Sequence, residues 1–426
     1  MNQLSKQKKV NVIIGNSAAG VSAIKAIRKY DSQCSIILIS KEDCIAYSPV
    51  LTTYYIAQQI DKSGMFIVND SFFKDYNVTP YLGTKAVEVD PDAGLVKLEN
   101  GKNIEFDNLL IATGSSPKRL GLEGEDLPGI YTLKSMSDAE RILKHSAHAK
   151  DIVVIGGGLI SLQATKALNR ADRNLTMLIS SNQLLSRNVD EKCSSLLEDT
   201  IKRAGVSILY KKNVKGFCRK GNRLMVGLDS DESLDADMIV IGKGVNPNID
   251  LVQNSQIATN RGIVVDESMR TNLPNIYAAG DVAEGPNILS GKNAIVANWI
   301  NACEQGITAG TNMAGGSLTY HNLGENVTNI FGLIIAVLGN SKSADETDNN
   351  SSNFDFNKGI YRKLHFNEKD ELDGAILVGQ ALDAGIISSL IRKRVKVPTV
   401  LREQIVCNAK ILSAWDYIRI SSYEPQ

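Results

Sequence analysis

A strand, a turn of small residues and a helix follow one another twice in this chain, and this repeat most constrains the fold. The first copy has the apolar run Val10–Ile14, then the turn Gly15–Gly20, then apolar residues at helical spacing. The second copy has the β-branched run Ile152–Ile155, then the turn Gly156–Ser161, then an amphipathic helix. We therefore expect an α/β protein with two Rossmann-like dinucleotide-binding domains.

Both turns keep small residues where a pyrophosphate would lie against the first turn of a helix. Small side chains there expose backbone N–H groups and the positive end of the helix dipole to the phosphates. Each turn departs at one position from Gly-x-Gly-x-x-Gly, with Ser17 in the middle of the first and Ser161 at the end of the second. One degenerate turn would be a weak signal, but two in the same context disfavour an ordinary turn. The candidate phosphate-binding residues are Gly15, Ser17, Ala18, Ala19 and Gly20 in the first turn and Gly156, Gly158, Leu159, Ile160 and Ser161 in the second.

The residues after the second strand of each unit bear on adenosine recognition. Glu42 follows the strand Ser35–Ser40, at the offset where a carboxylate can accept hydrogen bonds from a ribose, although a solvated turn charge is the alternative. In the second unit the strand Leu175–Ile179 ends in Ser180-Ser181-Asn182, with no carboxylate. We expect NAD(H) at the second turn, while Arg187 keeps NADP(H) open.

Composition excludes several classes of protein. The 47 basic and 47 acidic side chains balance, so no field of one sign attracts nucleic acid or an anionic membrane. The longest apolar run, Ile330–Leu338, is too short to span a membrane, and Met1–Lys9 is not a signal peptide. Six cysteines without a Cys-x-x-Cys pair disfavour a metal or cluster site. We expect a cytoplasmic protein of two to four domains.

Two further segments complete a family pattern. The strand Leu109–Ser115 runs into a small-residue turn, and the segment Thr271–Val282 ends a strand in Gly-Asp. Together with the two turns, this order resembles the pyridine nucleotide-disulfide oxidoreductase superfamily, flavoproteins with two dinucleotide-binding domains, from Val10 to about Gly316.

The resemblance implies FAD at the first turn and NAD(P)H at the second. It implies an FAD domain formed by residues 1–117 and 245–320, an NAD(P) domain over 118–244 and a small C-terminal α/β interface domain over 321–426. A helix begun near Asn293–Val296 would point its N-terminus at the flavin, and Asp281 would bind the ribityl chain. The further candidates are Ala112, Thr113, Gly114, Gly280, Asp281, Ile295 and Val296 for FAD and Ser180, Ser181 and Gly242 for NAD(P).

Val50 stands where the thiol-dependent members of the superfamily carry a redox cysteine, and Cys44 is more typical of a small buried residue. The resemblance is therefore to rubredoxin and ferredoxin reductases and to the FAD portion of assimilatory nitrite reductase. Several of those proteins pair a lysine with a glutamate near the flavin; the matching positions here are Thr53 and Gln163.

These resemblances imply an FAD-dependent NAD(P)H:acceptor oxidoreductase that needs no catalytic acid or base, because hydride passes directly between nicotinamide and flavin. The expected partner is an iron-sulfur protein or subunit, in a homodimer or a hetero-oligomer. The chain could be the FAD subunit of a 2-oxoacid dehydrogenase or aromatic-metabolism complex. The alternatives are an NADH oxidase and an NADH-responsive assembly subunit without significant turnover.

In the C-terminal region, Leu323–Gly339 and Gly359–Gly379 contain strand-like runs, and Ala384–Ile391 is an apolar helix. The Ser-, Asn- and Asp-rich segment Asn340–Lys358 is expected to be a mobile loop or a docking element. The segment Val397–Gln426 is expected to pack on its own domain.

Overall fold

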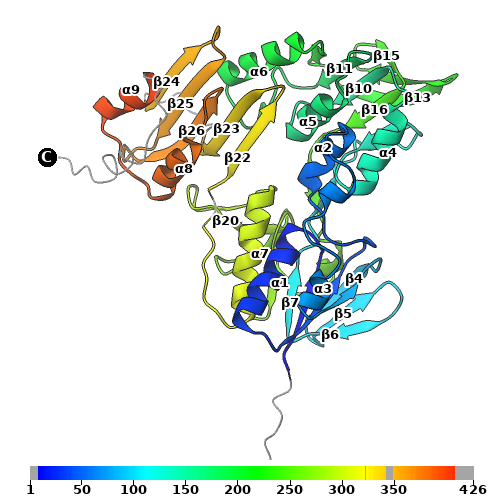
Figure 1. Ribbon diagram of the computed structural model, residues 1–426, viewed down its shortest axis with the longest axis vertical. Helices are drawn as coiled ribbons and strands as arrows, with labels where there is room; N and C mark the ends of the chain where they lie inside the picture. The colour runs from blue at the N-terminus through cyan, green and yellow to red at the C-terminus, as the bar shows by residue number, and fades with distance from the viewer. Residues whose placement is uncertain (1–7, 322, 342–348, 408–426) are drawn as a thin grey trace, which may run out of the picture. The chain divides into compact units, whose positions relative to one another are not determined.

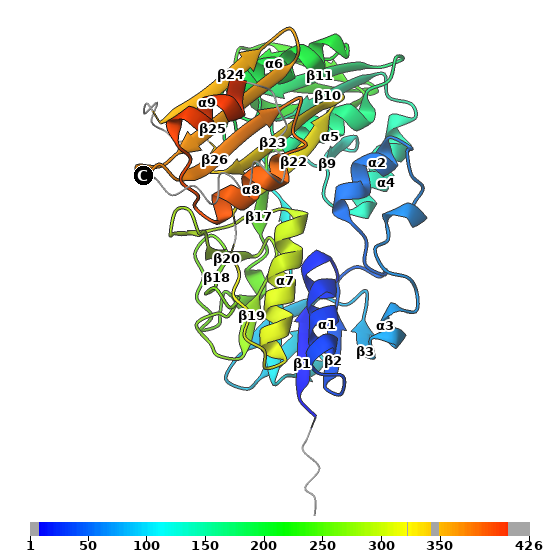
Figure 2. The ribbon, with the colours of Figure 1, turned by 60° about the vertical axis from the view of Figure 1, so that its left-hand side comes forward.

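The computed structural model describes residues 8–321, 323–341 and 349–407. The chain forms two compact units (Figures 1 and 2). Unit 1 contains Met1–Thr52, Ile60–Ser116 and Val245–Asn322, and unit 2 contains Thr53–Gln59, Pro117–Gly244 and Leu323–Gln426. Each unit is therefore assembled from three separate stretches of chain.

Unit 1 is built on a parallel five-stranded sheet in the order β19-β7-β1-β2-β3. Its strands are β1 (Val10–Ile14), β2 (Ser35–Ile39), β3 (Val78–Tyr81), β7 (Asn108–Ile111) and β19 (Ile276–Ala278). The chain leaves β1 towards β2 and later returns to its other side as β7. The strand order thus reverses at β1, where an open α/β sheet has its ligand crevice at the carboxyl ends of the strands.

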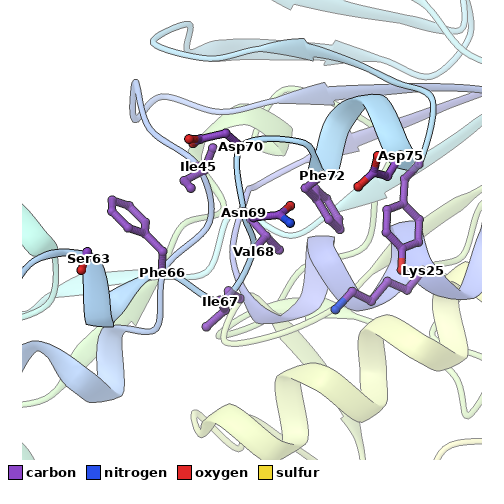
Figure 3. Close-up of a pocket in the computed structure, with 11 residues that line it drawn as sticks. Lys25, Ile45, Ser63, Phe66, Ile67, Val68, Asn69, Asp70, Phe72 and Asp75 are labelled. Atoms are coloured by element: carbon purple, nitrogen blue, oxygen red, sulfur yellow. The ribbon is translucent and has the colours of Figure 1, made fainter.

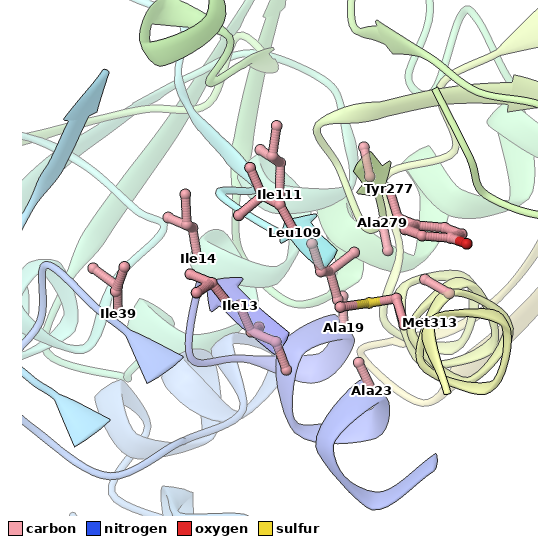
Figure 4. Packing of buried hydrophobic residues seen from close by; sticks show 14 of the residues in the cluster. Ile13, Ile14, Ala19, Ala23, Ile39, Leu109, Ile111, Tyr277, Ala279 and Met313 are labelled. Atoms are coloured by element: carbon pink, nitrogen blue, oxygen red, sulfur yellow. The ribbon is translucent and has the colours of Figure 1, made fainter. Parts of the chain in front are cut away.

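Helices α1 (Ala18–Tyr30) and α7 (Trp299–Met313) lie side by side in both views (Figures 1 and 2). Their backbones touch because α7 carries glycines at the contact: a Cβ on Gly306 would lie 2.2 Å from the Ala19 carbonyl oxygen, and one on Gly310 would lie 2.5 Å from that of Ala23. Figure 4 shows the buried core that the sheet, α1 and α7 share.

The rest of unit 1 consists of short elements, and the boundary between the units falls within two of them: only Thr52 of α2 belongs to unit 1, and Pro117 of β8 belongs to unit 2. The elements are η1 (Pro49–Leu51), α2 (Thr52–Ile56), η2 (Ser63–Met65), α3 (Phe72–Asp75), β4 (Ala86–Asp90), β5 (Leu95–Leu98), β6 (Asn103–Glu105), β8 (Ser115–Pro117), β17 (Val245–Pro247), η3 (Asp250–Val252), β18 (Ile263–Val264), β20 (Ala283–Pro286) and β21 (Asn293–Ala294).

Unit 2 repeats the same design with a parallel sheet in the order β12-β11-β10-β16-β9. Its strands are β9 (Ile130–Thr132), β10 (Asp151–Ile155), β11 (Asn174–Ile179), β12 (Ser207–Tyr210) and β16 (Met238–Ile241). The remaining elements of this part are α4 (Met136–Ser146), α5 (Leu159–Leu168), α6 (Glu191–Arg203), β13 (Val214–Lys220), β14 (Arg223–Leu228) and β15 (Ser233–Ala236). Both predicted βα units are confirmed.

The C-terminal part of unit 2 is an antiparallel sheet in the order β22-β23-β26-β25-β24. Its elements are β22 (Glu325–Ile330), β23 (Leu333–Gly339), β24 (Asn350–Asp355), β25 (Ile360–Phe366), β26 (Leu372–Val378), α8 (Ala384–Arg392) and α9 (Thr399–Cys407). Ile330 and Tyr361 of this sheet belong to the same buried cluster as Leu184 and Cys193. The strands and the helix predicted for this region are confirmed.

The prediction of a loop over Asn340–Lys358 is wrong in part. Asn350–Asp355 forms β24, which pairs antiparallel with β25. Its Ser and Asn residues need no apolar alternation because the exposed edge of β25 supplies their backbone partners, while the Phe354 ring packs edge-on against Tyr361. Residues 342–348 of the loop, and residues 408–426 of the C-terminal segment, lie outside the described part of the chain.

Among the described residues, no helix combines the length and the apolar character needed to cross a bilayer.

Candidate functional site

The two glycine turns are held by equivalent hydrogen bonds. The Gly15 N–H donates to the Ile39 carbonyl at 2.9 Å, as the Gly156 N–H does to that of Leu178 at 2.8 Å. The loop after the neighbouring strand is tied in the same way: the N–H groups of Ala112 and Gly242 each donate, at 2.8 Å, to the last residue of the central strand, Ile14 and Ile155. These bonds align the two copies residue by residue.

The first turn requires glycine at its two ends. Gly15 has φ +126°, and a Cβ there would lie 2.0 Å from the Ala112 carbonyl oxygen. A Cβ on Gly20 would lie 2.0 Å from the Gly15 carbonyl oxygen. Any side chain would therefore push the turn away from the adjacent loop or helix. Gly280 joins the same region, since its Cβ would lie 3.4 Å from that of Ala19.

Ser17 fits the middle position because it is the N-cap of α1 with φ −142°, which any residue adopts. Its hydroxyl does not cap the helix, and the first helical bond runs from Val21 N–H to the Ser17 carbonyl. The N–H groups of Ala18, Ala19 and Gly20 consequently have no partner among the described residues. Three free donors at a helix N-terminus suit a pyrophosphate, so these residues fit an FAD phosphate group.

Side chains at the end of β2 suit the adenosine half of a dinucleotide. Glu42 is half-buried, and its Oε1 accepts a hydrogen bond of 3.1 Å from the Tyr47 hydroxyl. Asn16 donates from Nδ2 to the Cys44 carbonyl at 3.0 Å, while its buried Oδ1 has no partner. A buried acceptor without a partner among the described residues can accept a hydrogen bond from a bound molecule or an ordered water.

The Gly-Asp segment is held by two contacts that the sequence did not predict, one to the segment after β7 and one to helix α7. Asp281 accepts a hydrogen bond of 2.6 Å from the Ser115 hydroxyl, and Gly280, at φ +83°, donates its N–H to Oε1 of buried Gln305 at 2.7 Å. Thr113 is also fixed, since its hydroxyl donates to the Asn248 carbonyl at 2.8 Å. Each contact joins residues far apart in sequence, so no local sequence pattern predicts it.

The helix expected near Asn293–Val296 is present as α7, but its predicted start is too early. Its first residue is Trp299, and Ile295 and Val296 lie in the loop before it. The start is set by Asn298, whose side chain accepts the Asn301 N–H at 2.8 Å. Asn301 in turn donates to the Val296 carbonyl at 2.7 Å, and its own buried Oδ1 has no partner among the residues that the structure describes.

The second turn accommodates Ser161 in place of glycine because Gly242 provides the room. Ser161 is fully buried, and its hydroxyl donates to the Gly242 carbonyl at 3.0 Å. A Cβ on Gly242 would lie 2.2 Å from that hydroxyl, and one on Gly156, where φ is +123°, would lie 2.4 Å from the Gly242 carbonyl oxygen. The departure from the glycine pattern is thus compensated on the next strand.

Gly158 plays the role that Ser17 plays in the first turn. It is the N-cap of α5, with φ −88°, and apart from its two neighbours in the chain no described residue has an atom within 4 Å of the position a Cβ would occupy. The next two residues, Leu159 and Ile160, begin the helix, and Ile160 remains exposed. The open space in front of this helix N-terminus suits a second pyrophosphate.

Lys243 contacts the end of β11, a contact that the sequence did not reveal. Its Nζ donates to the Ser180 hydroxyl at 3.0 Å, and Ser181 donates to the Gln183 carbonyl at 2.8 Å. Partial burial lowers the pKa of the Lys243 ammonium. Arg187 is exposed and forms no hydrogen bond or ion pair with the described residues.

Three further positions concern the redox cysteine and the lysine–glutamate pair that some family members carry, and Val50, Thr53 and Gln163 occupy them here. Val50 lies in η1 with an exposed fraction of 55%. Gln163 donates from Nε2 to the Thr328 hydroxyl of β22 at 2.7 Å, whereas Thr53 is buried in α2. Gln163 thus links α5 to the C-terminal sheet. Burial raises the pKa of the Cys34 thiol, and Cys44 is half-buried.

Unit 1 also has a cavity of about 890 Å³ (Figure 3). Lys25 of α1 borders it on one side, and Phe72 and Asp75 of α3 border it on another. The candidate cofactor residues are not among those that line this cavity.

Comparison with known proteins identifies the family. Residues 9–306 match the family described as pyridine nucleotide-disulphide oxidoreductase. The chain belongs to this family. Its members bind FAD and NAD(P)H, and this member is an oxidoreductase of the ferredoxin/rubredoxin reductase type.

Two relatives and one solved structure show the extent of the likeness. Subunit epsilon of the NADH-dependent phenylglyoxylate dehydrogenase of Aromatoleum evansii is 28% identical, with 93% of this chain and 94% of that protein covered. Rubredoxin-NAD(+) reductase of Pseudomonas putida is 30% identical, with 72% and 80% covered. The crystal structure of the covalent putidaredoxin reductase-putidaredoxin complex matches with a TM-score of 0.89 at 22% identity, covering 98% of this chain and 99% of that chain. The last likeness confirms the fold.

Proposed function

We propose that this protein carries electrons between NAD(H) and an iron-sulfur protein or subunit, through one FAD bound at the first turn. The observation that supports two dinucleotide sites is the pair of matching turns, each with an uncapped helix N-terminus. In this proposal residues 1–117 and 245–320 hold FAD, residues 118–244 hold the nicotinamide nucleotide, and residues 321–426 form an interface domain.

The flavin, when bound, accepts a hydride from the nicotinamide and can release electrons one at a time. The protein contributes position and electrostatics. The N–H groups of Ala18, Ala19 and Gly20 would bind the pyrophosphate, Glu42 would bind the adenosine ribose and Asp281 would bind the ribityl chain. Ser115 keeps the Asp281 carboxylate in place through their 2.6 Å hydrogen bond. No side chain has to transfer a proton, because holding two rings at transfer distance supplies the rate.

The names of the two relatives support an external acceptor. One is a subunit of an NADH-dependent dehydrogenase, and the chain covers almost the whole of it; the other is named for rubredoxin. We therefore propose that this protein can serve as the FAD subunit of a larger complex that oxidises a 2-oxoacid or an aromatic-metabolism intermediate, where electrons would flow towards NAD.

Anaerobic stopped-flow spectroscopy tests the proposal. NADH should bleach the flavin absorbance of the purified protein, and added rubredoxin or ferredoxin should restore it within seconds. Restoration by oxygen alone would favour an NADH oxidase instead. Stoichiometric bleaching that no one-electron acceptor reverses would favour an NADH-responsive assembly subunit.

The control is a variant that keeps the fold but obstructs the second turn. Gly158→Leu adds a side chain in open space at the N-cap of α5. It should retain bound flavin and its reoxidation after chemical reduction, while reduction by NADH slows. Unchanged reduction by NADH would argue against nucleotide binding at this turn.

A further inference from the structure

The two turns differ in charge where a Rossmann fold recognises the adenosine ribose. The Gly15 N–H donates to Ile39, and the Gly156 N–H donates to Leu178, so these two carbonyls are equivalent. Three residues further on, the first copy has Glu42 and the second has Ser181. A carboxylate in the first copy is thus replaced by a hydroxyl in the second.

The adjacent loop changes in the opposite sense. Ala112 and Gly242 are equivalent by their hydrogen bonds, so the residues after them, Thr113 and Lys243, are equivalent too. Thr113 is neutral, and its hydroxyl donates to the Asn248 carbonyl. Lys243 is a cation, and it donates to the Ser180 hydroxyl at the end of β11. Beside the same strand end, the second copy therefore has Ser181 where the first has the acid Glu42, and Lys243 where the first has the neutral Thr113.

Lys243 lacks a counter-ion in the described part of the chain. Its side chain is half-buried, and its Nζ has the Ser180 hydroxyl as a partner but no carboxylate within ion-pairing distance. A partly desolvated ammonium without an anion is unfavourable, so an anionic ligand would bind it well.

We propose that Lys243, Ser180 and Ser181 form a subsite for a phosphate on the 2′ position of the adenosine ribose, so that the protein binds NADPH as well as NADH. In a Rossmann fold a carboxylate at this place accepts the ribose hydroxyl of NAD, and a cation accommodates the 2′-phosphate of NADP. The inference rests on the proposed nucleotide site at the second turn and specifies which nucleotide that site accepts. The residues Ser180-Ser181-Asn182 by themselves favour NAD(H) and leave NADP(H) open, and Lys243 is the residue that favours binding of the 2′-phosphate.

Calorimetric titration of the FAD-loaded protein tests this subsite without catalysis. The two probes are 2′,5′-ADP and 5′-AMP, which differ by the 2′-phosphate alone. The protein should bind 2′,5′-ADP about tenfold or more tightly than 5′-AMP, the gain of one charge-assisted contact. Lys243→Met should remove that preference while it leaves the affinity for 5′-AMP within about twofold.

Two further variants make the test specific. Lys220→Met removes an exposed lysine of the same unit at the end of β13 and should leave both affinities unchanged. Ser181→Glu reproduces the acid of the first copy and should weaken 2′,5′-ADP about tenfold or more by repulsion. Their melting temperatures should match that of the parent protein.

The outcomes separate this inference from the proposed function. Equal affinities for both probes, or an equal loss of both in Lys243→Met, would overturn the 2′-phosphate subsite and leave the nucleotide site standing. Failure of the parent protein to bind 5′-AMP, 2′,5′-ADP, NADH and NADPH would overturn both.

Discussion

Gly156 and Gly158 stand two residues apart in one turn, yet they are glycine for different reasons. At Gly156 the backbone has φ +123°, and a Cβ would lie 2.4 Å from a carbonyl oxygen. At Gly158 the backbone has φ −88°, and the place of a Cβ is open. The first glycine serves the fold, and we infer that the second keeps space for a ligand.

This difference predicts that alanine at position 156 mainly lowers stability, whereas alanine at position 158 mainly weakens ligand binding. Gly156→Ala should lower the free energy of unfolding by about 2 kcal/mol or more, from strain and overlap. Gly158→Ala should cost less than about 1 kcal/mol, as an N-cap change, while it weakens NADH binding. Thermal unfolding and NADH titration measure both effects. A stable Gly156→Ala protein would contradict the steric argument.

Asp151, at the start of β10, gives a pH-dependent contribution to stability. Hydrogen bonds from Asn174, at 2.8 Å, and from Arg223, at 2.6 Å, hold the pKa of its carboxyl below the ordinary value. A carboxyl whose pKa is lower in the folded chain stabilises the fold at neutral pH. That stabilisation is lost as the pH falls through the folded-state pKa.

We therefore expect Asp151→Asn to reduce stability by about 1 kcal/mol at pH 7, since the pair is partly exposed. The deficit should shrink as the pH falls below about 4, because the parent carboxyl then becomes protonated. Melting temperatures of both proteins between pH 7 and 3.5 measure this. Asp172→Asn, at an exposed side chain, is the matched control. A deficit that is independent of pH would show that charge is not the cause.

At the scale of elements, the close contact with α7 holds in place the N-terminal part of α1, which carries the residues of the first turn. Gly306 is the point of closest approach, 2.2 Å from the Ala19 carbonyl oxygen if a Cβ were added. Gly306→Ala should therefore push α7 away from the helix that carries the FAD phosphate residues. Overpacking of this kind costs about 1–3 kcal/mol.

The expected result is a lower melting temperature together with a lower flavin content after purification. Ile307→Ala, on the next residue of α7, removes a side chain with an exposed fraction of 44% and should change neither value appreciably. If Gly306→Ala retained full flavin content and stability, α1 and α7 would be able to move apart without cost. That result would contradict the argument that their close backbone contact holds the first turn in place.

The elements that sequence could predict are those whose partners are close in the chain or whose periodicity is strong. The βα units at Val10 and Ile152, and the apolar strands of the C-terminal sheet, follow from local pattern. β24 does not, because a strand of Ser and Asn residues exists only through the edge offered by β25. The exact start of α7 does not follow from the pattern either, because Ile295 and Val296 before the cap are as apolar as the residues after Asn298.

The same limit applies to the candidate site. The two glycine turns can be recognised from the sequence alone, and in the structure each lies between the strand and the helix that the pattern predicts. Ser115, Gln305 and Lys243 act through contacts with residues distant in sequence, so only the folded chain reveals them. Ser161 shows the converse, since a departure from the motif that looks like a weakness is matched by Gly242 on the next strand.

At the scale of the whole molecule, the division into two units separates the two proposed ligands. FAD would bind residues of unit 1, and the nicotinamide nucleotide would bind residues of unit 2. A ligand stabilises the cooperative unit that binds it, by about 2.7 kcal/mol at a concentration of 100 times its Kd. Each ligand should therefore stabilise its own unit more than the other.

Hydrogen exchange followed by mass spectrometry tests this division on the flavin-free protein. Adding FAD should slow exchange in β1 and β7 by up to about a hundredfold, for amides that exchange through opening of the unit. NADPH or NADH should slow exchange in β10 and β16 to a similar degree. Uniform slowing of all four strands by either ligand would mean that the chain opens as one block. If FAD instead slowed exchange in β10 and β16 but not in β1 and β7, the cofactor assignment would be reversed. Such an exchange of sites is the alternative to test, because the two turns share one backbone design and differ in the charges at the ends of β2 and β11.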